Sequence, residues 1–128
     1  MIAAAIAAGL AMAALVWLRG RYVVVTVRGE SMTPTYQPGE RLLVRRTRTV
    51  RRGDCVVFAE AREQALALRA GWIVKRAVAV PGDGLPAGHL SVHGDNPDHS
   101  FDSRHFGPIT TDRLVGVVLR PMRSSGGR

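Results

Sequence analysis

The chain is almost free of lysine. Among its 128 residues there is one lysine, Lys75, against seventeen arginines. Arginine keeps its proton at physiological pH, whereas the surroundings of a lysine amine can lower its pKa. The sequence therefore contains one side-chain amine that can act as a base at neutral pH, and it lies in the apolar run WIVKRAVAV. A GC-rich coding bias also produces many arginines, so the residues around Lys75 must decide its meaning.

Cysteine and aromatic residues are also scarce. The single Cys55 excludes an intramolecular disulfide, and its place in CVVF predicts a small buried hydrophobic residue without a catalytic role. Aromatic residues make up 5% of the chain and none interrupts its arginine-rich run, so nucleic-acid bases have no stacking platform there. We expect this run to face solvent or anionic lipid, and no nucleic acid. The run contains Arg41, Arg45, Arg46, Arg48, Arg51 and Arg52.

Charged side chains are absent from the first 18 residues, MIAAAIAAGLAMAALVWL. As a helix this segment is about 27 Å long, close to the ~30 Å hydrocarbon core of a bilayer. It has no basic n-region and no A-x-A directly before Arg19, where residues 16–18 are VWL, which disfavours a cleaved signal peptide. We expect a single-pass anchor over 1–18, one folded domain over 19–120 and a disordered tail over 121–128. The arginines that follow the anchor favour a cytoplasmic C-terminal part under the positive-inside rule.

Short β-branched and apolar runs, separated by Pro and Gly, follow the anchor. The Ala-, Leu- and Arg-rich segment 61–70 predicts one helical excursion. Because strands do not alternate with helices, we expect a mainly β fold, a compact barrel or sandwich. The expected strands are Tyr22–Val27, Arg41–Arg45, Cys55–Ala59, Trp72–Val80, Leu90–His93 and Leu114–Leu119.

Ser31 is the candidate nucleophile, in the segment VRGESMTPTYQPGE. A serine between a strand and a turn can present its hydroxyl where backbone N–H groups point at an oxyanion, although serine is also a common turn former. A serine nucleophile needs a base, which is usually histidine.

Four histidines lie in one stretch of the chain, and nothing in their pattern singles one out as that base. With the neighbouring aspartates they lack the spacing of a metal site, so we expect no metal. The residues concerned are His89, His93, His99, His105, Asp95, Asp98 and Asp102.

Lys75 is the alternative base. At a pKa of about 10.4, roughly one lysine in 2,500 is neutral at pH 7. Burial that lowers the pKa to ~7–8 raises the neutral fraction to between about a tenth and a half. Ile73, Val74 and Val78 provide apolar surroundings of this kind.

Four segments resemble, in order, the conserved boxes of the type I signal peptidases, which are membrane-anchored Ser/Lys proteases. They are GESMTPT, RRGDCVVF, VKRAVAVPGD and GDNPDHSFDSRHFGPI. The resemblance implies a signal-peptidase-like β core and removal of signal or leader peptides after small residues, at A-x-A sites, through an acyl-enzyme. It implies preprotein substrates, no cofactor or metal, and a catalytic domain on the extracytoplasmic face of the cell membrane, against the direction that the arginines favour.

Residue roles follow from the same resemblance. Ser31 matches the nucleophile, Lys75 the general base and Ser100 the hydroxyl that orients the lysine amine. Gly29 stands where some members carry a hydroxyl for the oxyanion hole, so the second oxyanion donor here is a backbone N–H or water.

The substrate pocket and the supporting ion pairs are assigned in the same way. The pocket for the small residue before the scissile bond involves Met32 and Pro34. The ion pairs that support the site are Arg76 with Asp95 and Asp102 with Arg104.

Three other interpretations remain open at this point. PGDG and GDN are close in sequence, so the second β-domain of larger signal peptidases is missing, and short members of the superfamily include dedicated maturases such as those for nickel superoxide dismutase precursors. A self-cleaving repressor of the SOS type shares the Ser/Lys dyad, but it needs an N-terminal DNA-binding domain where this chain has an apolar 18-mer. The third is a catalytically silent basic module that binds anionic lipid or nucleic acid.

Overall fold

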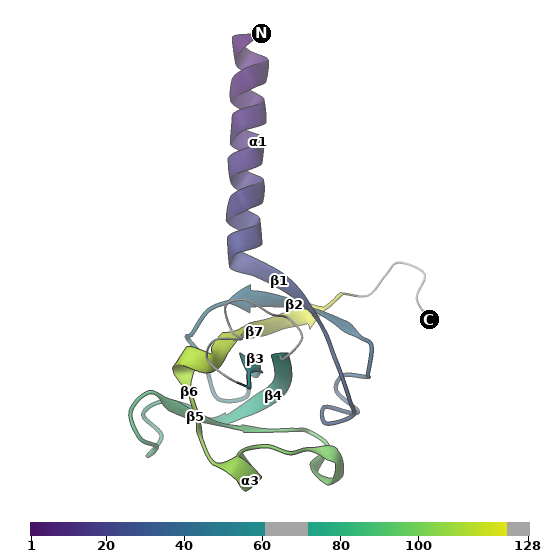
Figure 1. Cartoon of the computed structure of the whole chain (residues 1–128), viewed down its shortest axis with the longest axis vertical. Helices are drawn as coiled ribbons and strands as arrows, with labels where there is room; N and C mark the ends of the chain where they lie inside the picture. The colour runs from purple at the N-terminus through teal and green to yellow at the C-terminus, as the bar shows by residue number, and fades with distance from the viewer. Residues whose placement is uncertain (61–71, 123–128) are drawn as a thin grey trace.

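The computed structural model describes residues 1–60 and 72–122. The helical excursion expected at 61–70 therefore lies outside the described residues, as does most of the expected tail. Helix α1 (Ile2–Arg21) projects from a β-domain like a rod (Figure 1). None of its residues is buried, and its mean hydropathy of 2.0 and its length suffice for crossing a membrane. The helix ends where the β-branched run from Tyr22 begins, since such residues favour extended backbone.

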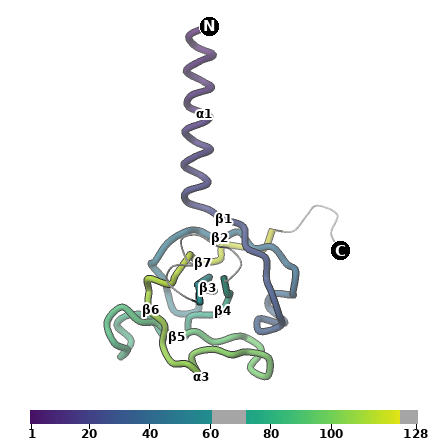
Figure 2. The backbone as a smooth tube through the Cα atoms, in the orientation of Figure 1, coloured from purple at the N-terminus to yellow at the C-terminus, as the bar shows by residue number. Residues whose placement is uncertain are grey.

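The described residues form a curled antiparallel sheet of seven strands, so the mainly β fold is confirmed. The strands are β1 (Tyr22–Thr26), β2 (Arg41–Arg46), β3 (Cys55–Ala59), β4 (Trp72–Ala79), β5 (His89–His93), β6 (Ile109–Thr110) and β7 (Leu114–Pro121). Their order in the sheet is β1-β2-β7-β3-β4-β5-β6. Figure 2 shows the backbone of these strands wrapping into a partial barrel below α1.

The sequence did not predict the shortest elements. These are β6, the helix α3 (Ser103–Phe106) and two 3₁₀ turns, Pro97–His99 and Thr111–Arg113. Each has two to four residues, too few for a hydrophobic period to be recognised. Strand β7 also extends to Pro121, one residue into the expected tail, and the Met122 N–H donates to the Arg41 carbonyl at 2.7 Å.

Strand β3 separates two apolar cores and is buried along its whole length. Val56 and Phe58 belong to one core, while Cys55, Val57 and Ala59 belong to the other. This double burial explains why β3 reads as a continuous apolar run and not as an alternation. Cys55 is buried, as expected for a small hydrophobic residue.

Strand β4 brings Lys75 into the interior. Trp72 and Val74 pack in the core that also contains the β1 side chains, whereas Ile73 and Ala77 pack in the other core. Because side chains alternate along a strand, Lys75 shares the face of Ile73 and Ala77. Only 4% of Lys75 is exposed.

The closest approach of β2 to β7 requires glycine at position 116. A Cβ there would lie 2.8 Å from the Arg45 carbonyl carbon and against its oxygen. We predict that Gly116→Ala lowers the free energy of unfolding by about 1–3 kcal/mol, because either strand must shift. Gly20→Ala is the control, since a Cβ on Gly20 meets nothing within 4 Å. Urea unfolding in detergent micelles measures both, and equal stability of the two variants would contradict the prediction.

Candidate active site

Ser31 lies in a turn that follows β1, two residues after Gly29, whose φ of 72° suits glycine. Asn96 ties this turn to the loop after β5. Its backbone N–H donates to the Ser31 carbonyl at 2.8 Å. Its side-chain amide donates to the Glu30 carbonyl at 3.1 Å and to Thr33 Oγ1 at 2.8 Å. Three hydrogen bonds from one residue therefore position the Ser31 turn.

Gly94 allows the Ser31 turn to approach Ser100. A Cβ on Gly94 would lie 2.6 Å from both the Ser31 carbonyl oxygen and Ser100 Cβ, and would collide with Ser100 Oγ. Sequence reasoning assigned no role to Gly94 or Asn96. Their place in the GDN segment was the only available signal, because both act on residues far away in the chain.

A hydrogen-bonded chain starts at the Lys75 amine. Lys75 Nζ donates to Ser100 Oγ at 3.0 Å, and Ser100 Oγ donates to Asp102 Oδ2 at 2.6 Å. Asp102 is fully buried and pairs with Arg104, whose Nε and Nη2 lie 2.9 and 2.6 Å from the two carboxylate oxygens. The structure thus brings together four of the residues that the sequence marked: Lys75, Ser100, Asp102 and Arg104.

The electrostatics of this hydrogen-bonded network favour the neutral amine of Lys75 and the ionised carboxylate of Asp102. Burial lowers the pKa of Lys75, and this effect exceeds the opposing effect of the Asp102 charge. Burial raises the pKa of Asp102, but hydrogen bonds from Arg104, Ser100 and the Gly94 N–H outweigh it and hold that pKa well below its usual range. A neutral amine keeps a lone pair while it donates to Ser100, so Lys75 can accept a proton.

A second ion pair joins β4 to the loop that follows Ser31. Arg76 donates to both carboxylate oxygens of Asp95, at 2.9 and 2.7 Å, and to the Gly53 carbonyl at 2.8 Å. Thr35 lies in the loop that follows Ser31, and its hydroxyl donates to Asp95 at 2.5 Å. The Arg76 hydrogen bonds lower the pKa of Asp95. This arrangement matches the pairing expected for Arg76 and Asp95.

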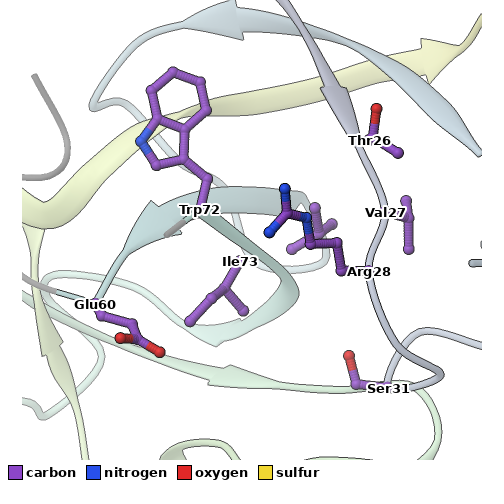
Figure 3. Close-up of a pocket in the computed structure, with 8 residues that line it drawn as sticks. Thr26, Val27, Arg28, Ser31, Glu60, Trp72 and Ile73 are labelled. Atoms are coloured by element: carbon purple, nitrogen blue, oxygen red, sulfur yellow. The ribbon is translucent and has the colours of Figure 1, made fainter. Parts of the chain in front are cut away.

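A groove of about 210 Å³ runs past Ser31. Figure 3 shows the Ser31 side chain at one end of it, with the segment after β1 on one side and the start of β4 on the other. The groove is lined by Thr26, Val27, Arg28, Ser31, Glu60, Trp72, Ile73 and Val74.

Comparison with known proteins identifies the family. The family model described as "Signal peptidase, peptidase S26" matches residues 1–85 and 83–122. The chain belongs to the signal peptidase family S26. Membership of a peptidase family favours the peptidase interpretation over a self-cleaving repressor or a silent basic module.

The relatives of this S26 chain include bacterial signal peptidases and mitochondrial inner membrane proteases. Signal peptidase I V of Bacillus subtilis is 28% identical, over 76% of the chain and 83% of the relative. Mitochondrial inner membrane protease subunit 2 of Mus musculus is 32% identical, over 71% of the chain and 61% of the relative. Mitochondrial inner membrane protease subunit 1 of Schizosaccharomyces pombe is 31% identical, over 77% of the chain and 71% of the relative.

The two residues assigned to the substrate pocket differ in burial in this S26 chain. Met32 is 1% exposed and packs in the core that contains the β1 side chains, whereas Pro34 is exposed. Neither Met32 nor Pro34 is among the described residues that line the groove.

We predict that replacing the buried amine changes how stability depends on pH. The folded-state pKa of Lys75 lies below its unfolded value of about 10.4, so between these two values the unfolded chain binds more protons and stability rises with pH. Lys75→Met lacks this contribution. It should therefore be more stable than the wild type near pH 7, with a difference that shrinks as the pH approaches about 10. Urea unfolding across this range tests the point, and a difference that does not change with pH would contradict it.

Proposed function

We propose that this protein is a membrane-anchored serine endopeptidase that removes signal or leader peptides from preproteins, with Ser31 as nucleophile and neutral Lys75 as general base. One observation carries the proposal. The single lysine of the chain is buried, has a lowered pKa and is hydrogen-bonded to Ser100, which Gly94 keeps close to the Ser31 turn. Family membership and the names of the relatives support the same activity.

The proposed reaction has two steps. Ser31 Oγ attacks the scissile carbonyl while its proton passes to Lys75 Nζ, and the C–N bond then breaks as Lys75 returns that proton to the leaving amine. Water, deprotonated by Lys75, hydrolyses the resulting ester and releases Ser31. The oxyanion is stabilised by backbone N–H groups of the turn that begins at Gly29. No metal or cofactor takes part in this mechanism.

Ser100 has an orienting role in this proposal. Its proton points to Asp102, so its lone pair faces the Lys75 N–H. The amine lone pair is then free to point toward the nucleophile turn. Arg104 keeps Asp102 ionised, which maintains this direction of the hydrogen bonds.

The substrate would bind as an added strand in the groove between β1 and β4. Strand β3 pairs with Ile73 to Lys75 on one side of β4, and β5 joins on the other side only from Arg76. An extended peptide can use this edge, with its small side chains turned toward Val27 and Val74 in the narrow groove. This supports cleavage after A-x-A. Met32 and Pro34 would then lie next to the groove wall and not in it.

We predict that Ser31→Ala and Lys75→Arg each lower kcat/KM about 10³-fold or more. The first removes the nucleophile, and the second keeps the positive charge but removes the titratable base. Cleavage of a fluorogenic peptide with an A-x-A site, by the full chain in detergent micelles, provides the measurement. Ser91→Ala on β5 is the matched serine control and should retain activity.

Comparison of protein N-termini in cells with the wild type and with Ser31→Ala would identify the substrates. Many new N-termini would indicate general preprotein processing, and one would indicate a dedicated maturase. Cleavage that persists in both Ser31→Ala and Lys75→Arg would rule out the dyad.

The membrane arrangement belongs to the same proposal. We place α1 across the cell membrane and the β-domain on the extracytoplasmic face, in contact with anionic lipid. The register pairs Tyr22 with Arg45, which brings the β2 arginines next to the end of α1. The Arg21 guanidinium lies 5.0 Å from the Trp17 ring centroid, an arrangement suited to the headgroup region.

We predict that a cysteine at exposed position 49 is labelled by a membrane-impermeant thiol reagent in intact cells. The variant is Thr49→Cys in a Cys55→Ala background, so that it carries one thiol. Labelling before lysis supports the extracytoplasmic arrangement. Labelling only after lysis would instead support the cytoplasmic side that the arginines favour.

A further inference from the structure

A second cavity of about 340 Å³ adjoins the groove at Ser31. The two share Ile73 and Glu60 as lining residues, so they meet at the start of β4. A peptide in the groove would therefore lie beside the opening of this second cavity.

Phenylalanine contributes three of the seven residues that line the cavity. The chain has three phenylalanines, and all of them line this cavity: Phe58, Phe101 and Phe106. Phe58 is 1% exposed and forms the floor, whereas Phe101 and Phe106 are 69% and 41% exposed. Exposed apolar side chains that gather in one place commonly mark a binding surface.

The aromatic wall is held in place by the same network that orients Lys75. The Phe101 ring stacks on His105 with centroids 5.1 Å apart, and it meets Phe106 edge-on at 5.3 Å. His105 Nδ1 accepts the Asp102 N–H at 3.2 Å as part of a capping box on α3. Phe101 also follows Ser100 directly in the chain. The wall is thus pre-organised for binding.

Arg113 closes the far side of the cavity. Its Nε donates to the Ala59 carbonyl at 2.8 Å, and its guanidinium carbon lies 5.6 Å from the Phe58 ring centroid. The Arg113 guanidinium therefore packs against Phe58 as part of the cavity wall.

The cavity lies within two or three residues of the expected scissile bond. Ile73 and Lys75 share one face of β4 and are two residues apart, or about 7 Å along a strand. A peptide extended beside β4 alternates its side chains, so the residue facing Ile73 is a near neighbour of the one facing Lys75.

We propose that this cavity is a specificity subsite that binds one large apolar or aromatic side chain of the peptide substrate, close to the scissile bond. The inference rests on the proposed peptidase function. Continuity with the Ser31 groove favours a peptide as occupant. Figure 1 places α3 at the end of the β-domain away from α1, which disfavours the lipid of the anchoring bilayer.

The test uses the full chain in detergent micelles and a set of A-x-A peptides. Each peptide carries Phe, Ala or Lys at one position, from three residues before the scissile bond to three after it. At one of these positions we expect Phe to raise kcat/KM about tenfold over Ala, with Lys the poorest, because burial of a phenyl ring is favourable and burial of an ammonium group is costly. Phe106→Ala should reduce the Phe-to-Ala ratio to about one. Leu119→Ala, which removes a similarly exposed side chain on β7, should leave the ratio unchanged.

Binding to Ser31→Ala separates this inference from the proposed function. Tighter binding of the Phe peptide than of the Ala peptide to Ser31→Ala, lost on adding Phe106→Ala, supports the subsite even if no peptide is cleaved. Equal binding of the two peptides would overturn it, although cleavage that depends on Ser31 would still support the peptidase. A cavity that serves lipid would show weaker vesicle binding in Phe106→Ala with no change in peptide preference, and this too would overturn the inference.

Discussion

The hydrogen bond from the buried Lys75 amine to Ser100 is the interaction on which the site depends. Taking an ammonium ion out of water costs several kcal/mol, so a buried lysine is favoured as the neutral amine. The Asp102 carboxylate, two hydrogen bonds away, would favour the protonated amine if its negative charge were not stabilised by other groups. Hydrogen bonds from Arg104 and the Gly94 N–H stabilise the Asp102 charge. Ser100 lies between Asp102 and the amine and connects them by hydrogen bonds. The Lys75 amine is thereby held in place without being protonated.

The curled sheet makes this burial possible. Because β3 is covered on both faces, β4 beside it has apolar side chains on either side, and position 75 faces a core instead of solvent. Strand β5 then pairs with β4 only beyond Lys75. The same strand therefore buries Lys75 and, within the described residues, pairs with β5 only from Arg76, which leaves the edge that we propose for an extended peptide.

The proposed catalytic site and the proposed specificity subsite are joined through one short segment, 94–106. Asn96 holds the Ser31 turn, Ser100 holds the amine, and the capping box on Asp102 fixes the rings around Phe101. Local hydrogen bonds within this segment, together with long-range ones to Lys75 and the Ser31 turn, hold it in place.

The sequence alone determined the outline of this protein. A charge-free helix of membrane length, β-branched runs between Pro and Gly, one lysine in an apolar strand and four ordered boxes specify an anchored β-domain of the signal peptidase family. These features are local, and periodicity or motif spelling reveals them. The pairing of Asp102 with Arg104 was also predicted, from the match of the fourth segment to its family box.

The tertiary structure decided which distant residues meet. The Asn96 bond to the Glu30 carbonyl joins residues 66 apart, and Gly94 matters only because two other segments press against it. The second cavity likewise combines β3, β4 and the segment around α3, so no stretch of sequence signals it. Such contacts depend on the curl of the sheet and on burial, which a linear pattern of residue types does not encode.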